Sequence, residues 1–175
     1  MAEGQGAIWW RVPRTRTERL AGLAVCLVLC YGASALGAVA TARSVATWYQ
    51  TLAKPGFTPP DWVFAPVWSA LYTMMAVALW LVWRRRGLAG AKPAVALFLA
   101  QLALNVMWTW LFFGYRRLDW ASFEIALLLV AIAATIRAFH RIDRIAALLL
   151  LPYAAWVAYA GLLTVAVWRL NLPAG

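Results

Sequence analysis

Five apolar stretches of about twenty residues follow one another along the chain, separated by polar or basic segments. They cover residues 20–39, 63–83, 94–113, 121–139 and 145–168. Because an α-helix rises about 1.5 Å per residue, roughly twenty apolar residues span the hydrocarbon layer of a bilayer, about 30 Å thick. The pattern predicts an all-α membrane protein built as a five-transmembrane-helix bundle.

Composition supports the same class and suggests one domain. Apolar residues make up 65% of the 175 residues and charged residues 13%, against about 45–50% and about 25% in soluble domains. We interpret residues 20–171 as a single transmembrane domain between a basic N-terminal tail (1–19) and a short C-terminal tail (172–175). The lipid bilayer is therefore an expected partner. Arginine far outnumbers lysine and Ala is abundant, which favours a bacterial membrane.

The first span has a second interpretation. A basic segment, an apolar core and small residues ending at Ala38-Val39-Ala40 resemble the three regions of a secretory signal peptide, whose cleavage would leave four helices. The apolar run is longer than an ordinary signal core, and its small residues also suit close helix packing or a homodimer. We expect the span to be retained, with the cleaved form as the alternative.

Basic residues are distributed unequally between the two ends of the predicted bundle. The N-terminal tail and the segments 84–92 and 137–144 hold eleven of them, and the opposite end holds five. Arg and Lys gather on the cytoplasmic side of multi-pass proteins. The asymmetry predicts a cytoplasmic N-terminus and favours an inner membrane. Because the basic residues flank apolar runs and do not form one soluble face, we expect no nucleic-acid partner.

The connection between the first two spans is long and stiff. Residues 48–68 read WYQTLAKPGFTPPDWVFAPVW, whereas helix connections in bundles usually need about 2–8 residues. Proline fixes φ and forces the preceding residue into an extended conformation, so the loop can hold a shape without secondary structure. Two interpretations fit: an aromatic belt at the membrane interface, and a lid over a pocket, which the length favours.

Aromatic and amide side chains share a face on two spans. Trp68 and Tyr72 are four residues apart on the second span, and Gln101, Asn105 and Trp108 follow helical spacing on the third. Amides at membrane depth are unfavourable unless they face the bundle and find partners. They can hold helices together or contact a ligand, and the spacing is compatible with both roles.

The fifth span combines a proline with a large ring and a small residue. Pro152 lacks a backbone N–H and predicts a kink in the helix. Trp156, Ala160 and Leu163 then share a face, so that Ala160 leaves a notch beside the Trp156 ring. Such a notch can receive a ligand or can be filled by ordinary core packing.

No group of residues indicates conventional catalysis or metal binding. The sequence shows no nucleophile–base pair, phosphate-binding loop or metal-spaced cluster, so we expect no cofactor and no metal. Cys26 and Cys30 lie in an apolar stretch and are expected to be buried thiols rather than a disulfide or metal site. Glu124, near the start of the fourth span, is favoured there by the helix dipole and is expected to be structural.

Three motif-rich stretches occur together and in a set order. They are residues 48–72, which continue the loop into SALY, residues 101–114 (QLALNVMWTWLFFG) and residues 152–171 (PYAAWVAYAGLLTVAVWRLN). In combination and order they resemble the TspO/MBR family of tryptophan-rich sensory proteins. These stretches cover the loop and parts of the second, third and fifth spans. It implies five packed transmembrane helices with a ligand pocket under the first inter-helix loop.

The resemblance also implies a function and a set of binding residues. Family members bind porphyrins, notably protoporphyrin IX, and other flat hydrophobic ligands. By position, the family's pocket corresponds to Ala38, Phe64, Trp68, Tyr72, Gln101, Asn105, Trp108, Trp120, Phe123, Trp156, Ala160 and Leu163. We therefore expect an integral membrane receptor or transporter-like protein that binds porphyrins in tetrapyrrole or stress sensing.

Two details of the resemblance leave alternatives open. Some bacterial relatives are reported to degrade porphyrin in light at the positions of Trp68 and Trp156, so a light-dependent porphyrin-degrading enzyme is the rival function. Both tryptophans are present, but no conventional catalytic group accompanies them, and we favour binding over turnover. The sterol pattern of animal members needs a Tyr between Leu163 and Arg169, where this chain has TVAVW. Sterol binding is accordingly less expected.

Overall fold

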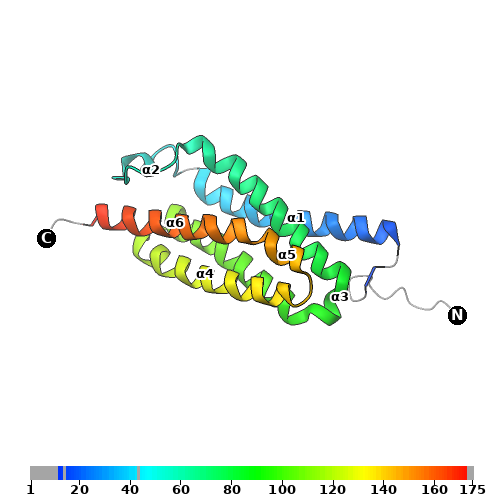
Figure 1. Cartoon of the computed structure of the whole chain (residues 1–175). Coiled ribbons are helices and arrows are strands. Elements are labelled where there is room, and N and C mark those ends of the chain that lie inside the picture. Colours follow the sequence, from blue (N-terminus) through cyan, green and yellow to red (C-terminus); the bar gives the residue numbers. More distant parts are fainter. Residues whose placement is uncertain (1–11, 14, 43, 173–175) are drawn as a thin grey trace.

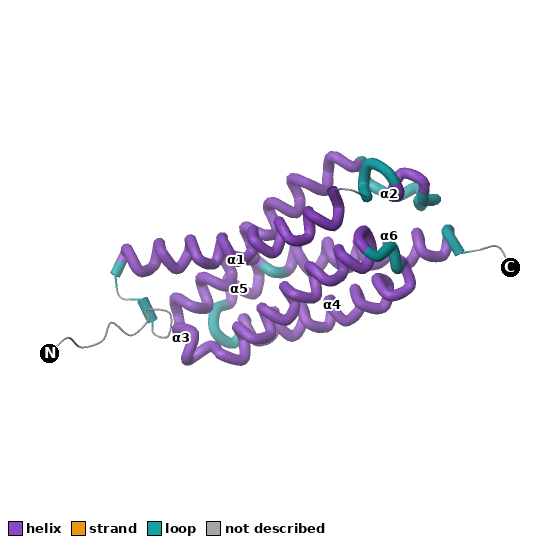
Figure 2. Tube along the Cα trace, turned by 180° about the vertical axis from the view of Figure 1, so that it is seen from behind, coloured by secondary structure: helices purple, strands orange, loops and turns teal. Residues whose placement is uncertain are grey.

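The described part of the chain is helical and elongated. The computed structural model describes residues 12–13, 15–42 and 44–172. Its helices are α1 (Arg16–Ala42), α2 (Trp48–Thr51), the short η2 (Asp61–Val63), α3 (Phe64–Thr109), the π-helical η3 (Trp110–Gly114), α4 (Leu118–His140), α5 (Arg144–Leu149) and α6 (Leu151–Leu170). The long helices lie side by side, with α2 and the first loop at the end nearer the C-terminus (Figures 1 and 2).

One of the long helical segments crosses the bilayer twice. Within the described residues, four segments are long and apolar enough to span a membrane, and one of them, Asp61–Gly114, has 54 residues. A straight helix of that length would measure about 80 Å, far more than a bilayer's hydrocarbon layer. Gly87 breaks it with a φ of 62° and a ψ of 175°, and the chain reverses there, so that the two halves lie side by side (Figure 1). The predicted five-helix bundle is confirmed.

The first helix is part of the bundle core. A stripe of small residues on α1 is buried: Gly22, Cys26, Cys30, Ala33, Gly37 and Ala40. The Tyr31 hydroxyl, on the same helix, lies 2.8 Å from Thr73 Oγ1 of α3. The buried stripe includes Ala33 and Gly37, which the sequence also allowed for a homodimer, so these two residues are used within the chain. This packing favours the expectation that the first span is retained.

Gly22 leaves no room for a side chain. A Cβ atom there would lie 2.0 Å from Cζ3 of Trp83, whose side chain is only 3% exposed. We expect Gly22→Ala to lower the melting temperature of the detergent-solubilised protein, because overpacking of this kind costs about 1–3 kcal/mol. Gly32→Ala is the matched control on the same helix, since no atom lies within 4 Å of its Cβ position. Equal stability of the two variants would contradict the packing of α1 on α3.

Contacts between the connecting segments group them at two ends of the bundle. At one end, Arg85 Nε donates to Asp143 Oδ2 at 2.9 Å, joining the turn after the second crossing to the turn after the fourth. At the other end, Asn171 exchanges two hydrogen bonds with the backbone of Ala53, at 3.0 and 2.9 Å, joining the first loop to the end of α6. The count of basic residues assumed that these connecting segments lie at opposite ends of the bundle, and these contacts agree with that assumption. Three of the counted basic residues lie outside the described residues: Arg11, Arg14 and Arg43.

Asp143 anchors the turn between the fourth and fifth crossings. Its Oδ1 atom accepts hydrogen bonds from the amides of Ile145 and Ala146, at 2.9 and 3.1 Å. Burial opposes its charge, but the bonds from Ala146, Arg85 and Ile145 hold its pKa below the ordinary value. Because the folded-state pKa is the lower one, the resulting stabilisation is present at neutral pH and is lost as the pH falls below about 4.

The last two crossings confirm one sequence expectation and correct another. The helix is interrupted at Leu150, between α5 and α6, and Pro152 stands in the first turn of α6. Glu124 differs from its expected place, because α4 begins at Leu118 and puts this residue in the second turn. Its side chain is buried, and neither carboxyl oxygen has a hydrogen-bond partner among the described residues.

Candidate ligand-binding site

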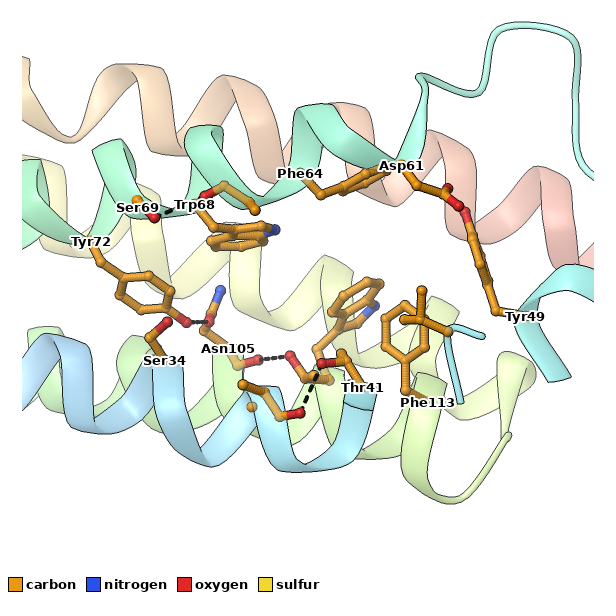
Figure 3. A pocket seen from close by; sticks show the side chains of 16 residues that line it. Ser34, Thr41, Tyr49, Asp61, Phe64, Trp68, Ser69, Tyr72, Asn105 and Phe113 are labelled. Carbon is orange, nitrogen blue, oxygen red and sulfur yellow. Dashed lines mark hydrogen bonds between the residues drawn. The ribbon is translucent and has the colours of Figure 1, made fainter. Parts of the chain in front are cut away.

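A cavity of about 420 Å³ lies between α1, the first loop and both halves of α3 (Figure 3). Its lining comprises Ser34, Gly37, Ala38 and Thr41 of α1; Val45 and Tyr49 of the loop; Asp61, Phe64, Ala65, Trp68, Ser69 and Tyr72 around the start of α3; and Asn105, Trp108, Thr109 and Phe113 near its end. The volume lies within the range of about 300–1,000 Å³ found for small-molecule sites.

Aromatic rings form the wall on the side of the second crossing. Trp68 packs against Tyr72 with ring centroids 5.6 Å apart, and its ring meets Tyr153 edge-on at 6.4 Å. Phe64 stands one turn earlier on the same face, and both Phe64 and Trp68 project toward the cavity, opposite Phe113 (Figure 3). Flat faces on both sides of a cavity are suited to stacking on a flat ring.

A hydrogen-bonded chain of three buried side chains closes the inner end. The Tyr72 hydroxyl donates to Asn105 Oδ1 at 2.7 Å, and Asn105 Nδ2 donates to the Tyr153 hydroxyl at 3.2 Å. The chain joins both halves of α3 to α6, with Asn105 in the middle. Asn105 therefore holds helices together, which confirms one of the two roles that the sequence left open. Its contact with a ligand stays a prediction.

The first loop is held in place over the cavity. The Tyr159 hydroxyl of α6 donates to the carbonyl of Phe57 at 2.6 Å, and Ser44 Oγ donates to the carbonyl of Phe113 at 2.6 Å. Tyr49 is buried against the aromatic cluster at the end of α3, 5.6 Å from the ring of Phe113. These contacts support the interpretation of the loop as a lid, because they tie it to α6 and to the end of the third crossing.

Six of the twelve predicted binding residues meet at this cavity: Ala38, Phe64, Trp68, Tyr72, Asn105 and Trp108. The three from α6 lie behind the aromatic wall, where Trp156 packs edge-on against Phe64 at 5.8 Å between ring centroids. Ala160 and Leu163 follow on the same helix, half-buried and buried respectively. Gln101 is buried deeper in α3, and neither of its side-chain amide atoms has a hydrogen-bond partner in the described part of the chain.

Trp120 and Phe123 do not line the cavity. Their side chains are 54% and 70% exposed on the outer surface of α4, beside a separate shallow depression that also includes Asp119. The helix turns its other face inward, where Ala121 and Ile125 are buried. Residues three apart share a helical face, so both aromatic rings point away from the bundle together.

The sequence argument found only Ala38 of the α1 lining and missed Asp61 at the cavity mouth. Ser34, Gly37 and Thr41 line the cavity from α1, and Asp61 lines it from the start of α3. The three α1 residues stand at i, i+3 and i+7, a small and polar stripe within an otherwise apolar helix. That spacing is the signal that could have found them.

These features describe an all-helical, multi-pass membrane protein with an aromatic cavity under its first loop. The model of the TspO/MBR family matches residues 24–169, which include part or all of every crossing. The chain therefore belongs to the TspO/MBR family.

Individual relatives match over most of their length. The translocator protein of Homo sapiens is 43% identical over 126 residues, which cover 71% of this chain and 75% of that protein. The tryptophan-rich protein TspO of Chlorobaculum tepidum is 37% identical over 158 residues, or 88% of this chain and 98% of that protein. The tryptophan-rich sensory protein of Cereibacter sphaeroides is 38% identical over 141 residues, covering 79% and 87% respectively.

Proposed function

We propose that this membrane protein binds porphyrins such as protoporphyrin IX, and similar flat hydrophobic ligands, in the cavity under its first loop. It would act as a receptor or transporter-like protein in tetrapyrrole or stress sensing. The observation that carries the proposal is the wall formed by Phe64 and Trp68, which faces the cavity opposite Phe113 (Figure 3). Membership of a family of tryptophan-rich sensory proteins supports it.

The aromatic wall supplies what burial alone cannot supply in a membrane. A flat hydrophobic ligand is already dissolved in lipid, so its transfer to an apolar cavity gains little free energy. Selectivity must come from the stacking of the flat ligand on aromatic side chains, worth about 1–3 kcal/mol per ring, and from shape. Ser34, Thr41 and Ser69 add a few neutral polar groups to the lining.

Binding is tested by titrating the purified protein, reconstituted in nanodiscs, with protoporphyrin IX in darkness. We expect saturable binding at one site, with competition by a second flat aromatic compound. Empty nanodiscs of the same lipid are the control, because porphyrins partition into bilayers. A signal that never saturates and equals that of the empty nanodiscs would overturn the proposed function.

Light-dependent porphyrin degradation is a second candidate, favoured by the contact of Trp68 with two further oxidisable rings, Tyr72 and Tyr153. Trp156 packs against Phe64 and is not part of the cavity lining. Illuminating the saturated complex tests this function. If it operates, Trp68→Phe should lose most product formation and Trp156→Phe much less. Undiminished turnover in the double variant would remove both tryptophans from any mechanism.

We also propose a bacterial inner membrane with the N-terminus in the cytoplasm. The turn that contains Arg85 and the turn that contains Asp143 lie at one end, together with most of the basic residues, and such clusters mark the cytoplasmic side. The cavity mouth would then face outward. Single cysteines at Thr58 and Gly90, placed after replacement of Cys26 and Cys30, report the topology. If Thr58→Cys were labelled only from the cytoplasm, the proposed orientation would be wrong.

A further inference from the structure

The mouth of the cavity carries a carboxylate. Among the described residues that line the cavity, Asp61 is the only acidic one, and none is Lys, Arg or His. It begins η2, directly before α3, and its side chain is exposed. Figure 3 shows this carboxylate at the loop end of the cavity, pointing toward the Tyr49 side chain.

The surrounding backbone and side chains position this carboxylate. Gln50 Nε2 donates to Asp61 Oδ2 and to the carbonyl of Val45, both at 3.1 Å. Pro60, with an extended backbone (φ −57°, ψ 143°), fixes the approach to η2. Burial raises the pKa of Tyr49, and the nearby Asp61 carboxylate raises it further. The acidic group is therefore close to the loop side of the lining.

A positive charge stands next to the same tyrosine. Lys54 Nζ lies 4.4 Å from the centroid of the Tyr49 ring. Lys54 is not part of the cavity lining, whereas Asp61 and Tyr49 are. Of these two charged groups, only the carboxylate belongs to the cavity lining.

No basic side chain among the described lining residues could pair with a ligand carboxylate inside the cavity. The polar groups there are neutral, among them Ser34, Thr41 and Ser69, and a charge at membrane depth is strongly unfavourable. Ionised groups of a flat ligand must therefore stay at the loop end. At that end they come close to Asp61, and like charges a few ångströms apart repel one another.

We propose that Asp61 is a specificity-determining residue, which disfavours flat ligands with free carboxylates at the cavity mouth and favours neutral or cationic ones. This inference rests on the proposed function, because it concerns ligands of the same cavity. It narrows the preferred class to flat tetrapyrroles or aromatic compounds whose mouth-facing edge is uncharged, positively charged or able to donate a hydrogen bond.

The test compares protoporphyrin IX with its dimethyl ester, which has the same ring without ionised carboxylates. Dark titrations use wild-type and Asp61→Asn protein in phosphatidylcholine nanodiscs. We expect Asp61→Asn to bind protoporphyrin IX about three- to thirtyfold more tightly, the range that Coulomb's law gives for like charges about 8 Å apart in partly desolvated surroundings. The affinity for the ester should not change, and the gain should shrink in about 1 M salt.

Asp119→Asn is the matched control. Asp119 is also an exposed carboxylate, but it pairs with Arg117 at 2.7 Å and lies outside the cavity lining. Asp119→Asn removes the same unit of negative charge as Asp61→Asn, but away from the cavity. It should therefore leave both affinities unchanged. Asparagine at position 61 keeps an oxygen to accept the Gln50 hydrogen bond, and an unchanged melting temperature would verify the fold.

The outcomes separate the inference from the proposed function. If neither ligand binds the wild-type protein saturably, the proposed function fails. If the ester binds saturably and Asp61→Asn leaves the ratio of the two affinities unchanged, only the role of Asp61 fails. An equal gain in Asp61→Asn and Asp119→Asn would also overturn that role, because it would reflect net charge alone.

Discussion

Replacing Trp68 with Leu should weaken protoporphyrin IX binding about 5- to 150-fold. Leu keeps much of the apolar bulk but removes the flat face that Trp68 presents to the cavity. Loss of one stacking ring costs about 1–3 kcal/mol, and each 1.4 kcal/mol is about tenfold in affinity. The dark titration in nanodiscs measures the change, with a melting curve to establish that the variant is folded.

Trp156→Leu is the matched control for that result. The Trp156 ring is also half-buried and aromatic, but it packs behind Phe64 and does not line the cavity. We expect its affinity to change less than about threefold, although its stability should fall. If Trp156→Leu weakened binding more than Trp68→Leu, the ligand would lie against α6, in the notch beside Ala160, and not in the cavity beside α1.

Asn105→Ala should destabilise the protein more than any other single truncation in the cavity wall. Loss of the two hydrogen bonds of Asn105 explains only a small part of the expected destabilisation, since interhelical bonds in membranes average about 0.6 kcal/mol each. The larger effect comes from Tyr72 and Tyr153, which are 5% and 0% exposed and would keep unpaired hydroxyl groups, at about 1–3 kcal/mol each. We expect a total loss of about 2–6 kcal/mol, measured as a lower melting temperature and denaturant midpoint.

A partial rescue distinguishes this account from simple loss of packing. Adding Tyr72→Phe and Tyr153→Phe to Asn105→Ala removes the unpaired hydroxyl groups while the rings remain. Stability should then recover in part, even though the triple variant has lost more polar atoms than the single one. Further, additive destabilisation would show that the hydrogen-bonded chain is not what Asn105 contributes.

The crossings and much of the aromatic wall could be predicted from the sequence. The apolar runs were long enough to count the spans, and Trp68, Tyr72, Asn105 and Trp108 stand at helical spacings that place them on inward faces. Polar atoms at membrane depth need partners, which made Asn105 recognisable. The rigidity of the first loop could be predicted from its prolines, because proline restricts the backbone wherever it occurs.

The outward face of α4 and the lining from α1 could not be predicted in the same way. In a bilayer the lipid-facing side of a helix is as apolar as the packed side, so hydrophobic periodicity does not tell the two apart. Trp120 and Phe123 entered the predicted set through the family resemblance alone, and no spacing argument could show that they face outward. Of the α1 lining only Ala38 was expected, through the family resemblance. The rest includes small residues such as Gly37, whose role depends on which helix packs beside them.

The most direct measurement locates the bound ring. A tetrapyrrole carrying a photoreactive diazirine is bound in nanodiscs in darkness, cross-linked by a brief ultraviolet pulse, and mapped by peptide mass spectrometry. We expect adducts within residues 34–41 of α1 and residues 61–72 around the start of α3, the segments that line the cavity, and their loss with excess protoporphyrin IX. Competed adducts concentrated on residues 119–123 of α4, or on residues 156–163 of α6, would contradict binding in this cavity.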